Sequence, residues 1–489
     1  MRRSSSLAAA LVLLVGGAGA RAADPPGGAL TEKIVCRDAP GQAYALYVPS
    51  SVSAGKPAPV LYLLDARGRA LLPIERFRAA ADASGWILVS SYNSRSDTRD
   101  DPNTPALQAM WNDTHGRLAI DPRRIYLGGF SGGARVAAAL AAQAPRAIAG
   151  VVACGAGFPE EIPKRGFPVP YFGTCGERDF NYYEMRALDH ALTKEKVRHR
   201  IAFFDGGHDW PPPDLAARAL AWLELEAMRS GARPKDEALA AKRLAADLAA
   251  AASLESAGDQ AGAWRLYAEA AEDYEGLADT APAAAKAEAL GRSEAVRKAL
   301  RDAARRDERD RDALQTLSAR VRAAARDPEI PAAASLAAQL GIPALKTRAA
   351  SGTPEERLSA ERLLANLRVE TGFYLPEEML ARGDAAHARL MLAVAVEIDP
   401  DEPRVYYNLA SAEARTGQTR RALRELDRAV AKGFRRFDRL DEDPDFARLR
   451  DDPEFRAWLA AARARFPAAA PTPAAPVSAP SPRAPGAGS

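Results

Sequence analysis

A corner of small residues around one serine, Gly128–Gly133, constrains the fold of this chain more than any other feature. It lies between Arg124–Leu127, which predicts a strand, and Ala134–Leu140, which predicts a helix. The five residues from Gly129 match the pattern G-x-S-x-G, whose glycines leave room for a sharp strand-to-helix turn. Such a turn lifts the Ser131 hydroxyl clear of the sheet and points the N-terminus of the helix at the same place. The corner therefore predicts a nucleophilic serine suited to acyl transfer.

The first half of the chain, about residues 30–230, alternates between strand-like and helix-like segments. The expected strands are 33–37, 44–48, 60–64, 86–90, 124–127, 150–153, 169–172 and 200–204. This alternation is typical of a doubly wound, mostly parallel sheet covered by helices on both faces. We expect the first two strands to pair as a hairpin with Ala39–Gly41 as the turn.

The second half, residues 235–466, is poor in glycine and rich in alanine and charge, which predicts an all-helical domain. Four positions recur after 34 residues: Gly383 and Gly417, Ala388 and Ala422, Leu392 and Leu426, and Ala395 and Ala429. This is the period of tetratricopeptide (TPR) repeats. It predicts repeats over 369–402 and 403–436, with a weaker copy over 244–277.

The charges of the chain nearly balance, with 67 basic and 64 acidic residues and a net charge of +3. There is thus no electrostatic case for binding nucleic acid. The run 305–312 alternates in sign and predicts a solvated helix face. It lies in the segment 280–365, which we expect to form degenerate helical pairs.

The two ends of the chain predict export and disorder. Residues 1–22 join a basic start and an apolar run to Ala20-Arg21-Ala22, the pattern of a cleaved signal peptide. No later segment is apolar enough to span a bilayer, so we expect a periplasmic or secreted protein without a membrane span. The tail 467–489, rich in proline, alanine and serine, predicts disorder.

The chain contains three cysteines, Cys36, Cys154 and Cys175. They are too few for a disulfide scaffold, and no spacing resembles a zinc site. Cys154 and Cys175 follow neighbouring predicted strands and are the better candidates for a disulfide, while three buried free thiols are the alternative. We expect neither a metal nor a cofactor.

A serine nucleophile needs a general base and an acidic group that orients the base. Asp179 and His208 each follow a predicted strand downstream of Ser131. Because the carboxyl ends of parallel strands meet at one edge of a sheet, the three side chains can come together there. The chain order Ser131, Asp179, His208 is the order that this architecture requires.

The acidic member has alternatives in Glu177, Asp205 and Asp209. Asp179 is favoured because its loop and the His208 loop follow different strands and can face each other, with Glu177 next. We expect the remaining histidines to have surface or packing roles; they are His115, His190, His199 and His387.

The oxyanion of an acyl-transfer reaction needs two backbone donors. One should be the amide of Gly132, directly after the nucleophile. The other should come from Ala66 or Arg67, in the loop that follows the third predicted strand. We expect the side chains of Arg67 and Arg69 to be solvated; the alternative is that they contact an anionic group of the substrate.

These residues together resemble the α/β-hydrolase superfamily, in particular small secreted bacterial esterases of the carboxylesterase, polyhydroxybutyrate-depolymerase and feruloyl-esterase type. The resemblance covers about residues 30–230 and is carried by Asp121–Gly133, the Asp179 loop and Gly207–Trp210. It implies a metal-free serine hydrolase with Ser131, Asp179 and His208 as its triad. Many such esterases have His-Gly where this chain has Asp65-Ala66, and an acidic side chain that pointed into the site would weaken catalysis. The helical half is similar to TPR proteins, which bind peptides or partner proteins.

The leading hypothesis is an exported serine esterase whose TPR-like domain binds a protein or peptide. The alternatives are an inactive hydrolase scaffold that acts through its repeats, and a serine peptidase with the same triad. About 15 residues separate the strands near 153 and 169, too few for a helical lid. An open site of this kind suits bulky or polymeric esters.

Overall fold

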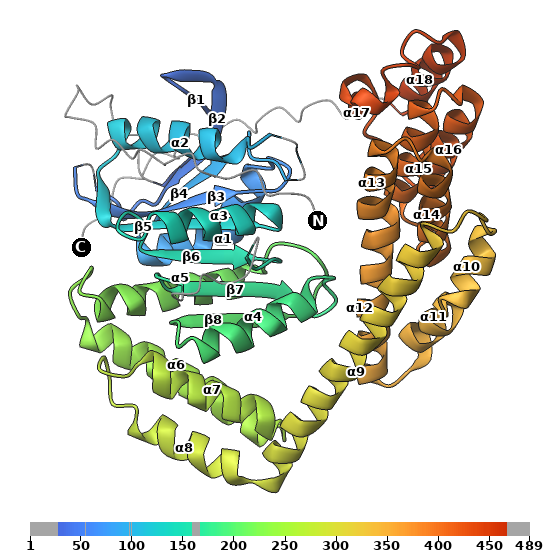
Figure 1. The fold of residues 1–489 in the computed structure, drawn as a ribbon. Helices are drawn as coiled ribbons and strands as arrows, with labels where there is room; N and C mark the ends of the chain where they lie inside the picture. The colour runs from blue at the N-terminus through green and yellow to red at the C-terminus, as the bar shows by residue number, and fades with distance from the viewer. Residues whose placement is uncertain (1–27, 54, 97, 99, 159–166, 467–489) are drawn as a thin grey trace, which may run out of the picture. The chain divides into compact units, whose positions relative to one another are not determined.

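The computed structural model describes residues 28–466 except 54, 97, 99 and 159–166. The chain divides into two compact units (Figure 1). The first contains the residues up to Leu317 together with Ala344–Asn366, and the second contains Ser318–Pro343 and the residues from Leu367 onward. The predicted signal peptide and tail, and most of the segment expected to be too short for a lid, lie outside the described residues.

The first unit is built on one sheet of eight strands in the order β1-β2-β4-β3-β5-β6-β7-β8. The strands are β1 (Ala29–Cys36), β2 (Ala39–Val48), β3 (Ala58–Leu64), β4 (Ile87–Ser91), β5 (Ile120–Phe130), β6 (Gly150–Cys154), β7 (Tyr171–Gly176) and β8 (His199–Phe204). The pairs from β4 through β8 are parallel, whereas β2 is antiparallel to both of its neighbours. The mostly parallel sheet predicted from the alternation is confirmed.

Helices cover both faces of this sheet, which explains why the central strands are apolar along their whole length. One face carries α2 (Asn103–Arg117), α3 (Gly132–Gln143) and α4 (Tyr182–Lys194), and the other carries α1 (Leu71–Ser84) and α5 (Pro213–Arg229). Every residue of β3 is buried. The sheet is therefore a rigid, two-sided platform for the loops at its carboxyl edge.

The hairpin predicted at the start of the chain forms, but its turn lies elsewhere. Strands β1 and β2 pair antiparallel, and Cys36 faces Ala39 across the turn. The turn residues are Arg37 and Asp38. The expected turn residues, from Ala39 to Gly41, instead begin β2. The predicted turn position was wrong because proline is also tolerated near the start of a strand and at bulges, and the pairing of β1 with β2 is irregular between Val35 and Cys36.

All three cysteines are buried free thiols, so this alternative is confirmed and Cys154 and Cys175 do not form a disulfide. Cys154 faces Thr174 across the pair of β6 and β7. Cys175, one residue further along β7, therefore points to the opposite face of the sheet. Burial raises the pKa of the Cys154 thiol to about 12, so the thiol stays protonated at neutral pH.

The rest of the described chain is helical, as predicted. The helices are α6 (Glu237–Ser256), α7 (Gln260–Asp273), α8 (Ala281–Arg292), α9 (Glu294–Ala324), α10 (Ala333–Gln339), α11 (Ile342–Ser351), α12 (Pro354–Val369), η1 (Glu370–Tyr374), α13 (Leu375–Ala381), α14 (Ala385–Ile398), α15 (Pro403–Arg415), α16 (Thr419–Ala431), α17 (Asp438–Glu442), η2 (Pro444–Phe446) and α18 (Pro453–Arg465). No helix among the described residues has the length and apolar character needed to cross a membrane.

The structure also corrects two details of the helical half. Helix α9 is one continuous helix of 31 residues, where the sequence suggested short degenerate pairs. The predicted solvated run 305–312 lies on α9, yet Asp310 within this run is buried. Charge alternation along a helix marks polar contacts as well as solvated positions, because buried carboxylates also need partners.

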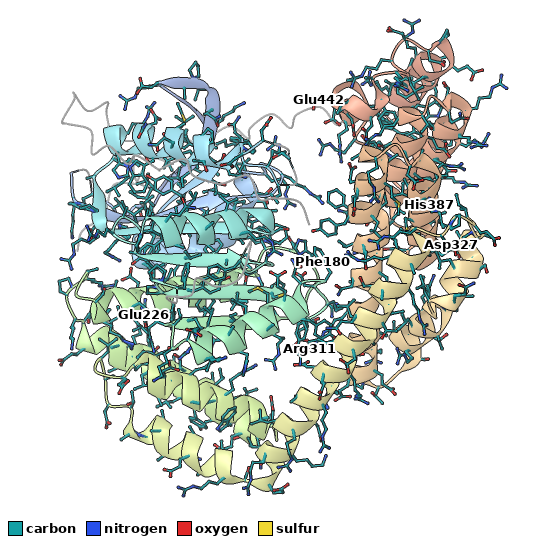
Figure 2. The ribbon with its side chains drawn as sticks, viewed as in Figure 1. Phe180, Glu226, Arg311, Asp327, His387 and Glu442 are labelled. Atoms are coloured by element: carbon teal, nitrogen blue, oxygen red, sulfur yellow. The ribbon has the colours of Figure 1, made fainter. Side chains whose placement is uncertain are left out.

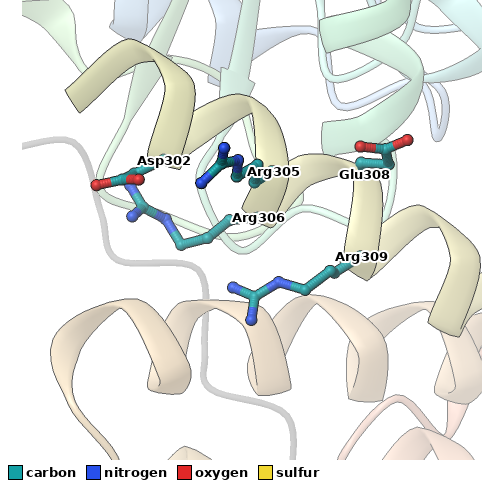
Figure 3. Close-up of a pocket in the computed structure, with 5 residues that line it drawn as sticks. All are labelled: Asp302, Arg305, Arg306, Glu308 and Arg309. Atoms are coloured by element: carbon teal, nitrogen blue, oxygen red, sulfur yellow. The ribbon is translucent and has the colours of Figure 1, made fainter. Parts of the chain in front are cut away.

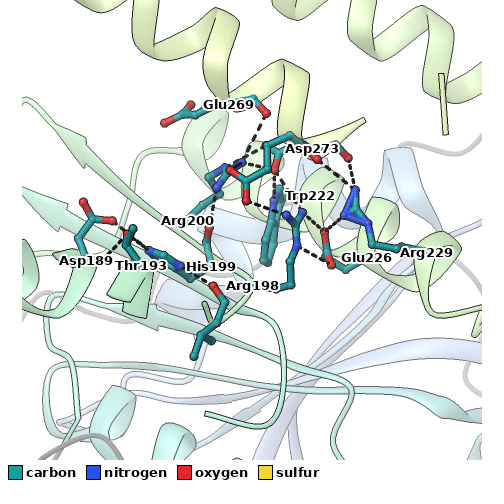
Figure 4. Close-up of polar contacts among 12 residues, drawn as sticks. Asp189, Thr193, Arg198, His199, Arg200, Trp222, Glu226, Arg229, Glu269 and Asp273 are labelled. Atoms are coloured by element: carbon teal, nitrogen blue, oxygen red, sulfur yellow. Dashed lines mark hydrogen bonds and ion pairs between the residues drawn. The ribbon is translucent and has the colours of Figure 1, made fainter. Parts of the chain in front are cut away.

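The first compact unit extends past the predicted domain boundary at 230–235, because helix α7 packs on the sheet domain through a polar network (Figure 4). Asp273 on α7 accepts hydrogen bonds from Trp222 Nε1 at 2.9 Å and from Arg200 Nε at 3.1 Å. Glu226 on α5, labelled in Figures 2 and 4, accepts from Arg198 at 2.7 Å. Burial raises the pKa of Asp273 to about 6, although Arg200 acts in the opposite direction.

Candidate active site

Ser131 occupies the tip of a strained turn between β5 and α3. Its φ angle is 56° and its ψ angle is −121°, a conformation that non-glycine residues rarely adopt. Its backbone N–H donates to the carbonyl of Cys154 on the neighbouring strand at 2.8 Å. The strain is held by the parallel pairing of β5 with β6 on one side and by the first turn of α3 on the other. This is the geometry that the serine corner predicted.

The glycines of the corner are required by close packing. A Cβ atom on Gly129 would lie 2.3 Å from the backbone of Gly133, and one on Gly133 would lie 2.0 Å from the carbonyl oxygen of Leu64. Neither position can hold a side chain without moving the turn. The pattern G-x-S-x-G thus has a direct steric cause in this chain.

His208 lies between Ser131 and Asp179 and is within hydrogen-bonding distance of both. Its Nε2 is 3.0 Å from Ser131 Oγ. Its Nδ1 is 2.9 and 2.8 Å from the two carboxylate oxygens of Asp179. With Nδ1–H donating to the carboxylate, Nε2 is left to accept the hydroxyl proton, which is the tautomer that a general base needs.

The surroundings of the three residues restrict water and motion. Asp179 is fully buried, whereas the His208 side chain keeps 22% of its surface exposed. The rings of Phe130 and Phe180 flank the imidazole, with centroid distances of 4.6 and 4.3 Å. Phe180 stands on the loop between β7 and α4, at the carboxyl edge of the sheet (Figure 2). The two aromatic rings therefore restrict the imidazole on two sides, and its Nε2 atom faces Ser131 Oγ.

The alternative acids have other contacts. Asp205 forms an ion pair with Arg178 and is largely exposed, and Asp209 lies 3.7 Å from Arg76. Glu177 is two residues from Asp179 in the same loop, but the oxygens within reach of His208 Nδ1 are those of Asp179. The distances thus favour Asp179 as the acidic partner of His208, as the positions of the two loops after different strands also did.

The contacts of the Arg67 amide narrow the choice of the second oxyanion donor between Ala66 and Arg67. The amide of Arg67 donates to Asp65 Oδ1 at 2.8 Å, so it is already engaged and cannot serve as predicted. The backbone amide of Ala66 remains the candidate donor from that loop. The other candidate donor is the amide of Gly132, at the start of α3. Helix α3 adds its positive N-terminal end at the same place.

Asp65 is hydrogen-bonded to protein groups of two loops. Its fully buried carboxylate accepts from Trp210 Nε1 at 2.8 Å and from Arg69 Nη2 at 2.8 Å. Burial acts to raise the pKa of Asp65, but the hydrogen bonds from Arg69 and Trp210 together hold it below its usual range. Asp65 thus ties its own loop, the candidate source of the second oxyanion donor, to the loop that carries His208. The expected effect of this acid on catalysis stays a prediction.

The remaining histidines have separate environments. His115 stacks on Trp111 with a centroid distance of 4.5 Å, and burial lowers its pKa. His199 lies 2.8 Å from the carbonyl of Val197. Among the residues that the structure describes, no three His, Cys, Asp or Glu side chains are grouped as metal ligands.

A separate hollow lies on helix α9 (Figure 3). Its five lining residues are charged and all come from this helix; they are Asp302, Arg305, Arg306, Glu308 and Arg309. Binding pockets for small molecules are mostly apolar with a few convergent polar groups. This hollow does not have that character, and its lining includes none of the predicted site residues.

Trp210 contributes to the site, although it was not among the predicted site residues. Its indole is 1% exposed and packs against Phe130 at a centroid distance of 5.6 Å. A signal was present, because a tryptophan two residues after His208 must bury its N–H against an acceptor. The acidic residue at position 65, unusual at that point, was the acceptor.

Comparison with known proteins gives partial similarity. No protein-family model matches the chain. A Nocardia uniformis subsp. tsuyamanensis protein named as an esterase, NocK, is 29% identical over 156 residues, which are 28% of this chain and 45% of that protein. The chain thus matches less than half the length of this relative.

Two solved structures are similar to part of this chain at low sequence identity. The S-formylglutathione hydrolase FrmB of Staphylococcus aureus is 15% identical, with 41% of this chain and 99% of that chain covered and a TM-score of 0.33. The hyperthermophilic esterase of the archaeon Pyrobaculum calidifontis is also 15% identical, with 41% and 86% covered and a TM-score of 0.34. From its own strand order, serine turn and covering helices, the first unit has an α/β-hydrolase fold.

Proposed function

We propose that this chain is a serine hydrolase that cleaves carboxylic esters through an acyl-enzyme on Ser131. One observation carries the proposal: Ser131 Oγ, His208 and Asp179 form one hydrogen-bonded series at the carboxyl edge of the sheet, with Ser131 on a strained turn. The partial match to a protein named as an esterase supports the same class of reaction.

The geometry gives each residue one role. Ser131 Oγ attacks the carbonyl carbon of the ester while His208 Nε2 takes the hydroxyl proton. The amides of Gly132 and Ala66 stabilise the oxyanion, and Asp179 stabilises the imidazolium. The imidazolium then donates its proton to the alkoxide that leaves. In the second half, His208 activates a water molecule that releases the acid and restores Ser131.

A substrate panel tests this proposal and its closest alternative together. The full chain is incubated with p-nitrophenyl esters of short and long acyl chains, and with p-nitroanilide peptides. We expect turnover of the esters and at least tenfold lower kcat/KM for the anilides. Turnover of anilides with no turnover of esters would instead identify a peptidase. No turnover of either would support the inactive scaffold.

We further propose that the chain is exported. The support is the signal-peptide pattern of residues 1–22, which lie outside the described part of the chain. The test is the intact mass of the protein recovered from the periplasm or medium of an expressing bacterium. A mature form that starts after Ala22 is expected, and an uncleaved chain that stays inside the cell would contradict export.

We also propose that the repeat region binds a protein or peptide partner. The support is the 34-residue period and the packing of α13 to α16 as successive helices in which Ala388, Ala395, Ala422 and Ala429 are fully buried. Small buried residues let neighbouring helices approach closely, as stacked repeats require. Saturable binding of the full chain to members of a peptide library is expected. Its absence across the library would contradict this role.

A further inference from the structure

The loop that carries Asp179 is held by two helices that come more than a hundred residues later. This loop joins β7 to α4, and the two helices are α9 and α12. The parts of α9 and α12 that make the contact, up to Leu317 and from Ala344 to Asn366, belong to the first compact unit with the sheet. They therefore form part of the same body as the candidate active site.

Arg362 on α12 makes the most direct contact. Its Nε donates to the carbonyl oxygen of Glu177 at 2.6 Å, two residues before Asp179. Its guanidinium lies over the ring of Tyr182 at 3.6 Å from the centroid. The residue is 9% exposed. A buried arginine with a charge-assisted hydrogen bond to backbone is a strong, directional contact.

Asp310 on α9 holds the start of α4 from the same side. Its carboxylate accepts from Tyr183 Oη at 2.7 Å and from Ser359 Oγ of α12 at 2.6 Å. One turn of α4 further on, Arg186 Nε donates to Asp307 Oδ2 at 3.0 Å. The two helices and the loop are thus joined by one set of partly buried polar contacts.

These contacts reach the position of the Asp179 carboxylate through the loop backbone. The amide of Asn181 donates to Asp179 Oδ1 at 2.8 Å, and the amide of Tyr182 donates to the Asp179 carbonyl at 3.0 Å. Asn181 Nδ2 in turn donates to the carbonyl of Gly155 at 2.7 Å. Arg362 contacts Glu177, two residues before Asp179, and Tyr182, the last residue of this turn. A displacement of Glu177 or Tyr182 would therefore move the carboxylate away from His208.

We infer that Arg362 is a positioning residue for Asp179, so that the helical region supplies part of the framework of the active site. This inference rests on the proposed function. Arg362 touches neither substrate nor reacting atoms; it fixes the loop from which Asp179 orients His208. Small errors in the placement of such groups lower kcat strongly, because the reacting geometry tolerates little displacement.

The test compares four full-length proteins: the unsubstituted chain, Arg362→Ala, Arg362→Lys and the control Arg357→Ala. Arg357 lies on the same helix and is exposed. For each, kcat and KM are measured with a p-nitrophenyl ester, and the concentration of competent sites is obtained by titration with a fluorophosphonate. Thermal unfolding shows which variants are folded.

We expect Arg362→Ala to lower kcat per competent site by about tenfold, with KM changed less than about twofold. Arg362→Lys should recover only part of this loss, because an ammonium group can still donate to the Glu177 carbonyl but lacks the planar guanidinium that lies over the Tyr182 ring. Arg357→Ala should match the unsubstituted chain. Tyr183→Phe, which removes one hydroxyl, should lower kcat by a few-fold. This variant tests the inference even if Arg362→Ala does not fold.

Two outcomes would overturn the inference, and they differ from failure of the proposed function. Unchanged kcat in both Arg362→Ala and Tyr183→Phe would show that the contact only anchors the helices. A loss in Arg362→Lys as large as in Arg362→Ala would show that the donated hydrogen bond is not the cause. Absence of Ser131-dependent hydrolysis in the unsubstituted chain would overturn the function itself, and the inference with it.

Discussion

Ser131 and Asp179 lie at the same edge of one sheet but are held there in different ways. Ser131 is fixed by its own turn: a positive φ angle, glycines packed against backbone, and one hydrogen bond to the next strand. Asp179 sits on a loop that depends on contacts from distant helices, above all from Arg362. The position of the proposed nucleophile is therefore set by local structure, and the position of the proposed acid is set by tertiary packing.

This difference indicates which residues of the candidate site keep their position when other parts of the molecule are substituted. A strained turn between two paired elements keeps its shape as long as the sheet exists. A loop held by polar contacts of separate helices responds to each of those contacts. We therefore expect substitutions outside the sheet to affect Asp179 before they affect Ser131.

The largest effect should come from Ser131→Ala, which removes the nucleophile and leaves the turn in place. We expect ester turnover to fall by at least about 10⁴-fold, toward the rate left by oxyanion stabilisation alone. The melting temperature should fall no further than for an ordinary surface substitution. Steady-state hydrolysis and thermal unfolding check both statements. Retained turnover would show that another residue acts as nucleophile.

Asp179→Asn should have the next largest effect. An amide can favour the wrong tautomer of His208 and cannot stabilise the imidazolium, so kcat should fall by about 10³- to 10⁴-fold. The matched control is Asp205→Asn, on the neighbouring loop, where the side chain is 84% exposed. We expect the control to keep wild-type kcat/KM. Equal losses in both variants would break the assignment of Asp179.

Trp210→Phe tests the link between the oxyanion loop and the base loop, and its effect should be smaller. It removes one hydrogen bond to the buried Asp65 carboxylate, at a cost of about 1–3 kcal/mol in stability. We expect kcat/KM to fall by about tenfold, through displacement of His208.

Trp222→Phe is the control for that experiment, because it also removes an indole hydrogen bond to a buried carboxylate, that of Asp273. The expected melting temperatures of the two variants are similar, whereas the loss of activity should be confined to Trp210→Phe. Equal activity in the two variants would show that Asp65 and Trp210 contribute to stability alone.

The smallest effect on activity should come from His387→Asn, in the second unit. Hydrogen bonding to the Asp327 carbonyl, and then to the Asp384 carboxylate, raises the pKa of His387 (Figure 2). Both neighbours are acceptors, so only the imidazolium can donate to both. The resulting stability is fully present below the unfolded pKa and is lost as pH rises through the folded value.

We therefore expect His387→Asn to lower the melting temperature more at about pH 5 than at about pH 8, with unchanged ester turnover. Thermal unfolding of the two proteins at both pH values is the measurement. A difference that grows with pH would contradict the direction of this pKa shift.

Much of the fold followed from patterns of short range. All eight strands were predicted, most of them because they are compact apolar segments between helix-like stretches, and the serine corner carries its own steric signature. The hairpin turn was misplaced by two residues because Ala39–Gly41 suits both a turn and the start of a strand. The choice between a disulfide and free thiols stayed open because proximity of two strands does not show which face each side chain takes.

The parts of the candidate site that sequence did not predict depend on residues far apart in the chain. Asp65 and Trp210 are 145 residues apart, and Arg362 and Glu177 are 185 apart. Periodicity and spacing carry no information about such pairs, because they arise when separate elements pack. Asp310 is a further example: it lies in a run that predicted a solvated face, yet it is buried and accepts hydrogen bonds from Tyr183 and Ser359.

The most direct test of the account is covalent labelling of the full chain with a fluorophosphonate, followed by mass spectrometry of its peptides. The account predicts one adduct, on the peptide that contains Ser131, and no adduct in Ser131→Ala. An unlabelled Ser131, or equal labelling of Ser131→Ala, would contradict the claim that Ser131 is an activated nucleophile.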